Sequence, residues 1–260
     1  MDSRQTKYIA GCSGGKDSVA QLILTKEHNE PLDEVVYCEV MFSPEISGEV
    51  PEHREFIYQT LKPFVEDVLR VPFIILRSQK TYLDVFNHII TRGVHKGKTH
   101  GFAIPSMCAI NRDCKIPPIE NYWKQQGKVV TQYVGIAADE PKRLERLRGT
   151  NRVSLLEKYR ITEQQALKLC RDRGLLSPTY GFTQRNGCWF CPNCKDSEWA
   201  HMIYQHESLF DMLIDLEQNT PDIYRTCLTR SETPTQLKRR IVSYGEQISL
   251  FGGNDRQRTG

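Results

Sequence analysis

The chain has 260 residues, of which 39% are hydrophobic and 26% charged, a balance typical of a domain with an apolar core in water. No apolar run approaches the length of a membrane span, and the first residues lack the apolar core of a signal peptide, so a cytoplasmic location is expected. The formal net charge of +3 is too small to indicate a nucleic-acid partner by itself.

Strand-like and helix-like segments alternate through the first half of the chain. Strands are expected at residues 7–11, 34–41, 72–76 and 129–135. Helices are expected at residues 16–28, 51–61 (extending in one interpretation to 69), 83–91 and 118–126. This alternation predicts an α/β fold, a doubly wound, mostly parallel sheet with helices on both faces.

The second half of the chain is predicted to be helical around a cysteine-rich turn. A helix is expected at residues 161–173, with Thr162 as its N-cap and Gly174 ending it. Further helices are expected at residues 196–217 and 235–244.

The segment between the first expected strand and the first expected helix is typical of a phosphate-binding loop. It consists of Ser13, Gly14, Gly15, Lys16, Asp17 and Ser18. Glycines permit a tight turn, and backbone N–H groups at a helix N-terminus attract phosphate. Lys16 adds a positive charge, and the serines add hydroxyl donors. The segment predicts a nucleotide site; the alternative is a glycine turn that starts a helix.

Two further segments fall at or just past strand ends, residues 39–42 and 135–143. Ligands of parallel α/β sheets bind at the carboxyl ends of the strands, so these segments should meet the glycine loop in one crevice. We therefore expect residues 1–150 to form a nucleotide-binding α/β domain. Residues 151–250 should form a helical region with the cysteine-rich turn, packed on that domain, and residues 251–260 a disordered tail.

Five of the nine cysteines fall in two groups, a spacing that indicates metal ligation. Cys188 and Cys191 form a C-x2-C pair, followed by Cys194, and Cys108 and Cys114 lie far upstream. We predict Cys108, Cys114, Cys188 and Cys191 as ligands, with Cys194 in reserve.

Four thiolates suit a [4Fe–4S] cluster or zinc, and spacing does not decide between them. The alternative is that these cysteines are separate buried residues. The remaining cysteines have apolar or strand neighbours and are expected in the core; they are Cys12, Cys38, Cys170 and Cys227.

Residues 142–173 contain ten basic and four acidic residues. This excess would suit an anionic substrate, a nucleotide or an RNA, or would form a solvated helix face. Trp123, Trp189 and Trp199 are candidates for stacking on a base, or for the core.

Three segments resemble the phosphoadenosine phosphosulfate reductase-like family of the PP-loop ATP pyrophosphatases, the adenine nucleotide alpha hydrolase superfamily. Residues 13–18 match the phosphate loop, and residues 114–117 (CKIP) resemble a Cys-Lys-x-x-Pro segment. Residues 135–143 resemble Gly-x-Arg-x-Asp-Glu-Ser-x-x-Arg, with Ala137 where an arginine is usual. The resemblance covers roughly residues 7–195 and implies binding of ATP or a sulfated adenine nucleotide.

The phosphate loop would hold the β- and γ-phosphates, with Lys16 offsetting charge on the leaving pyrophosphate. Asp17 would hold Mg2+, and Asp139 and Glu140 would hold a second Mg2+ or a ribose hydroxyl.

The remaining candidates come from other strand ends. Glu39 and Met41 would contact adenine or ribose, and Gly135 belongs to the same nucleotide site. Lys115, Lys142 and Arg143 would stabilise negative charge at the α-phosphate or the acceptor.

Reductases of this family carry a catalytic cysteine near the C-terminus, whereas no cysteine follows Cys227 here, and Ala137 removes an expected anion contact. Relatives without that cysteine resemble sulfur-insertion enzymes, such as DNA phosphorothioation ATP pyrophosphatases and tRNA thiolation proteins. In adenylyl sulfate reductases a similar cysteine layout holds a [4Fe–4S] cluster.

We therefore predict an ATP-dependent adenylating enzyme that forms AMP and pyrophosphate and supports sulfur transfer to a nucleic acid or a small metabolite. A cysteine desulfurase or another sulfur donor is the expected partner. The alternatives are an adenylyl-sulfate or phosphoadenylyl-sulfate reductase, and a non-catalytic nucleotide-binding module with structural zinc.

Overall fold

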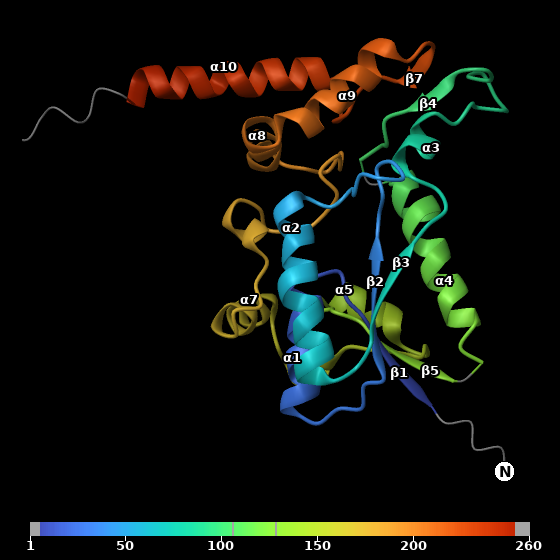
Figure 1. Ribbon diagram of the computed structural model, residues 1–260, viewed down its shortest axis with the longest axis vertical. Helices are drawn as coiled ribbons and strands as arrows, with labels where there is room; N and C mark the ends of the chain where they lie inside the picture. Colours follow the sequence, from blue (N-terminus) through green and yellow to red (C-terminus); the bar gives the residue numbers. More distant parts are fainter. Residues whose placement is uncertain (1–5, 106, 128, 253–260) are drawn as a thin grey trace, which may run out of the picture. The chain divides into compact units, whose positions relative to one another are not determined.

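A computed structural model describes residues 6–105, 107–127 and 129–252 of the chain (Figure 1). The chain divides into two compact units. Unit 1 comprises Met1–Thr81 and Asn111–Cys188, and unit 2 comprises Tyr82–Ile110 and Trp189–Gly260.

These units differ from the predicted division at residue 150. Residues 82–110 group with the C-terminal helices, because their aromatic side chains pack there: Tyr82 lies 4.2 Å from Phe190, ring centroid to ring centroid. Residues 151–188 group with the sheet instead. Of the predicted tail, residues 253–260 lie outside the described residues, whereas 251 and 252 continue the last helix.

Unit 1 contains a five-stranded sheet of β1 (Lys7–Gly11), β2 (Glu34–Glu39), β3 (Phe73–Arg77), β5 (Val130–Tyr133) and β6 (Arg152–Val153). Every pairing in it is parallel, in the order β3-β2-β1-β5-β6. The chain winds outward from β1 to β3 and then returns to place β5 on the other side of β1. This reversal makes a topological switch point between β1 and β5, and it confirms the predicted α/β class.

The helical segments of unit 1 connect these strands. They are α1 (Lys16–Glu27), α2 (Pro51–Phe56), η1 (Ile57–Leu61), η2 (Phe64–Leu69), η3 (Asn111–Lys115), α4 (Ile116–Lys124), α5 (Pro141–Leu144), η4 (Glu145–Leu147), α6 (Leu155–Lys158), α7 (Glu163–Asp172) and η5 (Pro178–Gly181).

Helices cover both faces of the sheet, with α1, α2 and α7 on one side and α4 on the other (Figure 1). The β2 strand is buried along its whole length, as expected for a central strand of a parallel sheet. The helix α7 begins as the sequence predicts, because Thr162 and Gln165 form a reciprocal capping box.

Unit 2 combines helices with a two-stranded parallel sheet. Its elements are α3 (Tyr82–Phe86), β4 (Thr99–Gly101), α8 (Asp196–Gln205), α9 (Glu207–Asn219), β7 (Ile223–Arg225) and α10 (Pro234–Gly252). The predicted helix at residues 83–91 is wrong beyond Phe86, where the chain instead forms a turn that leads into β4. Within the described residues, no helix has the length and apolar character needed to cross a membrane.

Half of the cations in the basic stretch at residues 142–173 form ion pairs in unit 1. Five of its ten cations contact carboxylates: Arg143 with Glu140, Arg148 with Glu145, Lys158 with Glu30, Lys168 with Asp172 and Arg173 with Glu27. These pairs agree with a solvated helix face, and an anionic partner for the stretch stays a prediction.

Candidate nucleotide site

The loop after β1 requires glycine at position 14. Gly14 is buried and has a φ of +74°, and a Cβ there would lie 2.7 Å from Cε1 of His53. Both the backbone conformation and the lack of space exclude a side chain. Because Gly14 has no side chain, the loop backbone can lie directly against His53.

The serines of the loop bond mainly within the loop. The Ser18 hydroxyl donates to the Gly15 carbonyl oxygen at 2.9 Å and accepts from the Ser13 N–H at 3.2 Å. The Lys16 N–H donates to the hydroxyl of Tyr180 at 2.9 Å. A phosphate that used this N–H would therefore replace the Tyr180 hydroxyl.

His53 fastens the loop to the rest of unit 1. Its Nε2 lies 2.9 Å from the Ser13 carbonyl oxygen, and its Nδ1 lies 2.9 Å from Oγ of Ser177. Burial lowers the pKa of His53 and favours the neutral ring. Nε2 then donates to the carbonyl, and Nδ1 accepts from the hydroxyl. The amide of Asn186 adds a bond to the Gly14 carbonyl oxygen at 3.3 Å.

The loop after β5 touches the start of α1. A Cβ on Gly135 would lie 2.6 Å from the backbone N of Ser18. A side chain at position 135 is therefore excluded by backbone atoms, which cannot move aside as a flexible side chain can. The loops after β1 and β5 thus meet at the switch point, as the positions of their residues at strand ends predict.

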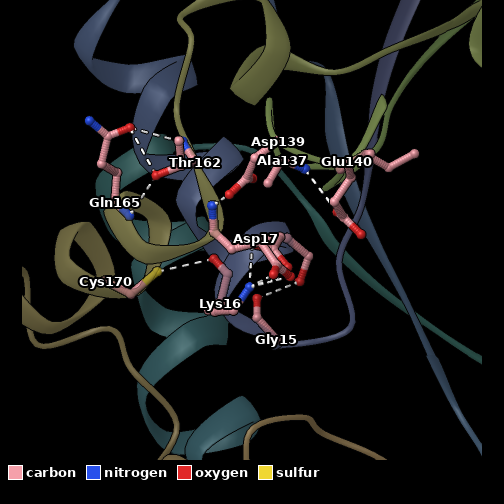
Figure 2. Close-up of polar contacts among 12 residues, drawn as sticks. Gly15, Lys16, Asp17, Ala137, Asp139, Glu140, Thr162, Gln165 and Cys170 are labelled. Carbon is pink, nitrogen blue, oxygen red and sulfur yellow. Dashed lines mark hydrogen bonds and ion pairs between the residues drawn. The ribbon is translucent and has the colours of Figure 1, made fainter. Parts of the chain in front are cut away.

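Three carboxylates converge beside this contact, and we call Asp17, Glu140 and Glu163 the acidic trio. Their ligand oxygens lie within 4.8 Å of one another. Figure 2 shows Lys16 and Asp17 at the start of α1, with Asp139 and Glu140 on the neighbouring loop. Nζ of Lys16 lies 2.8 Å from Asp17 and 3.1 Å from Glu163.

The acidic trio has three carboxylates, and the cations that pair with them are Lys16 and Arg143. Negative groups therefore outnumber positive ones in this cluster. Burial raises the pKa of Asp17, and the nearby charges of Glu163 and Glu140 raise it further. Burial opposes the charge on Lys16, but its bonds to Asp17 and Glu163 outweigh burial and raise its pKa. Carboxylate oxygens are the ligands that Mg2+ prefers, so the acidic trio fits a magnesium ion.

Asp139 and Arg143 support this cluster from its edge. The Asp139 carboxylate accepts the backbone N–H of Glu163 at 3.0 Å, at the first residue of α7. Arg143 is exposed, and its guanidinium lies 2.5 Å from the Glu140 carboxylate. Asp139 therefore positions Glu163, a role that the sequence did not predict. Lys142 is exposed to solvent.

Glu39 is enclosed by donors at the end of β2. Its fully buried carboxylate accepts from Arg54 at 2.8 Å, Arg77 at 2.5 Å, Tyr58 at 2.9 Å and Ser47 at 2.8 Å. Burial would raise the pKa of Glu39, but these hydrogen bonds outweigh it and lower the pKa. Both oxygens are thus occupied by protein, and a nucleotide would meet the half-exposed arginines first.

Met41 and Lys115 lie near the same sheet edge. Met41 is buried and forms an antiparallel bridge with Ser47. Lys115 is the last residue of η3. Burial raises the pKa of the Cys38 thiol to about 11, and the positive charge of Lys115 acts in the opposite direction. The charge of Lys115 also assists burial in lowering the pKa of His53. Lys115 therefore acts electrostatically on residues beside the loop.

The predicted cysteine ligands are divided between the two units. Cys114 and Cys188 belong to unit 1, and Cys108, Cys191 and Cys194 belong to unit 2. The buried Sγ of Cys114 lies 3.6 Å from the Thr81 carbonyl oxygen. A backbone hydrogen bond from Cys194 to Cys191 closes the turn between them at 3.0 Å. The four-cysteine site remains a prediction from the sequence.

The other cysteines and the tryptophans have mostly structural positions. Cys12, Cys38 and Cys170 are buried as predicted, whereas Cys227 is half-buried and lines a cavity in unit 2. Cys227 departs from the prediction because it follows the short strand β7 rather than a core segment. Trp189 and Trp199 are each 1% exposed, so they belong to the core.

Glu163, His53 and Tyr180 are the site residues that sequence analysis missed. Each comes from a segment outside the recognised motifs. For Glu163 the sequence contains one indication of its place, because it directly follows the predicted N-cap Thr162 and therefore lies at a helix N-terminus. For His53 and Tyr180 it contains none, since a single histidine or tyrosine in the first turns of a short helix has no functional pattern around it.

The comparisons with known proteins are sparse. No protein-family model matches the chain, and no curated protein is significantly similar to it in sequence. The chain resembles the solved structure of the U34-tRNA thiolase NcsA from Methanococcus maripaludis with its [4Fe-4S] cluster. The identity is 18%, the TM-score is 0.41, and the match covers 94% of this chain and 72% of that one.

Proposed function

We propose that the chain is an ATP-dependent adenylating enzyme of the PP-loop type that supports sulfur transfer to an acceptor. One observation carries the proposal: a glycine loop with Lys16 and the acidic trio meet at the carboxyl ends of the neighbouring strands β1 and β5. That position is the ligand site of doubly wound sheets, and it offers both anion-binding and cation-binding groups.

In this proposal, N–H groups and cations contact the phosphates, and carboxylates contact the metal ion. N–H groups at the start of α1 would hold the β- and γ-phosphates, and the acidic trio would hold Mg2+, which would offset phosphate charge. The acceptor oxygen attacks the α-phosphorus, the bond to the α,β-bridging oxygen breaks, and pyrophosphate leaves with that electron pair. Lys16 and Arg143 offset the negative charge that develops. A sulfur nucleophile then displaces AMP from the acceptor.

The predicted metal centre is a second part of the proposal. Cys108, Cys114, Cys188 and Cys191, with Cys194 in reserve, would hold a [4Fe–4S] cluster or zinc, and thiolates are the right donors for either. A bound cluster would supply a site that carries sulfur, whereas zinc would stabilise the fold. Broad visible absorbance after anaerobic purification would separate the two, because zinc is colourless.

The first test is calorimetric binding of ATP, adenylyl sulfate and phosphoadenylyl sulfate to the full chain, with Mg2+ and without oxygen. We expect preference for ATP. Pyrophosphate release is then measured with candidate acceptors, including transfer RNA, DNA and small metabolites, together with a cysteine desulfurase. Acceptor-dependent release identifies the acceptor class.

Two outcomes contradict the proposal in different ways. Preference for a sulfated nucleotide would favour the reductase alternative and would require a thiol from Cys227 or a partner. Binding of ATP with no pyrophosphate release under any condition would favour the non-catalytic nucleotide-binding module.

A further inference from the structure

Unit 2 contains a cavity of about 510 Å3 that the proposed function does not use. It lies where the chain leaves the two parallel strands β4 and β7. Phe102 and Ile104 form part of an apolar wall, and Tyr224, Arg225, Thr229 and Arg230 add polar and charged groups. The volume falls in the usual range of small-molecule sites.

The framework of this cavity is tightly packed. Gly101 has a φ of +82°, and a Cβ there would lie 2.4 Å from the carbonyl oxygen of Arg225. The Phe102 N–H donates to that same oxygen at 3.0 Å. The two strands are thus held backbone against backbone, so the cavity walls are formed before any ligand arrives.

An aromatic stack joins the cavity to a neighbouring turn. The ring of His95 stacks on Tyr224, with centroids 3.8 Å apart, and the Arg225 guanidinium lies 5.3 Å from the Tyr224 ring. His95 belongs to the turn of residues 90–98, which backbone hydrogen bonds close from Ile90 to Lys98 and from Gly97 to Ile90. Val94, in the same turn, is 93% exposed.

Cations are concentrated in this turn and in the lining of the cavity that it adjoins, and we refer to these cations together as the strip. Residues 85–105 contain no acidic residue. The strip consists of Arg92, Lys96, Lys98, Arg225 and Arg230. In the part of the chain that the structure describes, none of these five forms an ion pair. By contrast, Lys238 and Arg240 of the same unit each contact two carboxylates.

We propose that this strip binds a single-stranded nucleic acid, with one base in the cavity and adjacent phosphates along the turn of residues 90–98. A mononucleotide would need only the cavity cations, whereas the row of unpaired cations fits a chain of phosphates. The apolar wall and the exposed edge of Tyr224 suit a base that has left its stack, which a duplex does not provide. The inference is independent of whether unit 1 cleaves ATP.

The test is fluorescence anisotropy of the full chain with labelled single-stranded RNA and DNA of one mixed sequence, about 12 nucleotides long, without ATP. The triple variant Arg92→Gln, Lys96→Gln, Lys98→Gln should weaken binding about tenfold and reduce the slope of log Kd against log salt by about 2. Arg239→Gln is the matched control, since it removes an exposed cation of α10 outside the strip.

Tyr224→Ala should weaken binding about tenfold without changing the salt slope, because it removes an aromatic wall of the cavity and the ring on which His95 stacks, rather than a charge. Tyr224→Phe keeps the ring and should bind as the natural chain does, which controls for folding. Tighter binding of RNA or of DNA identifies which nucleic acid is preferred, and either supports the proposal.

Three results would overturn it: no binding of either strand, unchanged binding in both the triple variant and Tyr224→Ala, or displacement of the strand by polyglutamate of equal charge. The last would indicate an acidic polypeptide as partner. The Lys16→Ala variant should keep nucleic-acid binding, so failure of ATP cleavage and failure of this inference remain distinguishable.

Discussion

Glu39 and the acidic trio are two carboxylate groups at one edge of the sheet of unit 1, with opposite electrostatic surroundings. Glu39 accepts from two guanidiniums and two hydroxyls, and its pKa is lowered. In the acidic trio, Asp17 has a raised pKa because burial and the neighbouring carboxylates outweigh Lys16. A carboxylate whose charge is balanced by neighbouring donors and cations stabilises the fold. Carboxylates that outnumber the cations around them favour a bound metal ion.

Removing the cation of the trio should have the largest effect. Lys16→Ala removes the cation that pairs with Asp17 and Glu163 and leaves Arg143 as the remaining side-chain cation near the phosphates. We expect pyrophosphate release to fall by about 10²–10³-fold. The control is Lys168→Ala on the exposed surface of α7, whose loss should leave the rate unchanged. Equal rates for Lys16→Ala and the natural chain would place the chemistry elsewhere.

Removing the charge of Glu39 should act on stability instead. Glu39→Gln weakens charge-assisted bonds from Arg54 and Arg77, and we expect the free energy of unfolding to fall by about 2 kcal/mol. Urea unfolding measures this, with the exposed Glu55→Gln as control. If ATP affinity falls while stability is unchanged, Glu39 contacts the nucleotide directly, as the sequence alone suggested.

Glu163 tests whether the trio is a cation site. Glu163→Gln should raise the Mg2+ concentration needed for half-maximal pyrophosphate release by about tenfold, because one of three anionic ligands is lost. Asp172→Asn, at the other end of α7, is the matched control. An unchanged Mg2+ requirement would mean that Asp17 and Glu140 act without Glu163.

The smallest expected effects are on how the free energy of unfolding depends on pH. Glu39 and Asp17 should change it in opposite directions. The pKa of Glu39 is lowered on folding, so its stabilisation is present at neutral pH and is lost as the pH falls through that lowered pKa. The pKa of Asp17 is raised, so Asp17 reduces stability as the pH rises from about 4 through its raised pKa.

Asp17→Asn should therefore raise the Tm of the nucleotide-free protein slightly at pH 7 and leave it unchanged near pH 3. The Tm difference between Glu39→Gln and the natural chain should shrink over the same fall in pH. Melting curves at several pH values, without Mg2+, measure both. A lower Tm for Asp17→Asn at pH 7 would show that its pair with Lys16 dominates.

Most of unit 1 was predictable because its cues are local. Strands 7–11 and 72–76, the cap at Thr162 and the glycine loop each depend on residues close in sequence. The division into units was not predictable, since the helix-like spacing of residues 83–91 does not show that Tyr82 packs on Phe190 or that residues 82–110 group with the C-terminal helices. Local pattern does not specify which distant surface a segment covers.

The sequence by itself determined the α/β class and the position of the glycine loop, because hydrophobic periodicity and glycine geometry act over a few residues. Only the tertiary structure decided which carboxylates are neutralised and which converge. Arg54, Arg77 and Glu163 reach their partners across many residues of chain. The charge state of a carboxylate depends on burial and on those distant groups, so an acidic residue's role as anchor or ligand is a property of the fold.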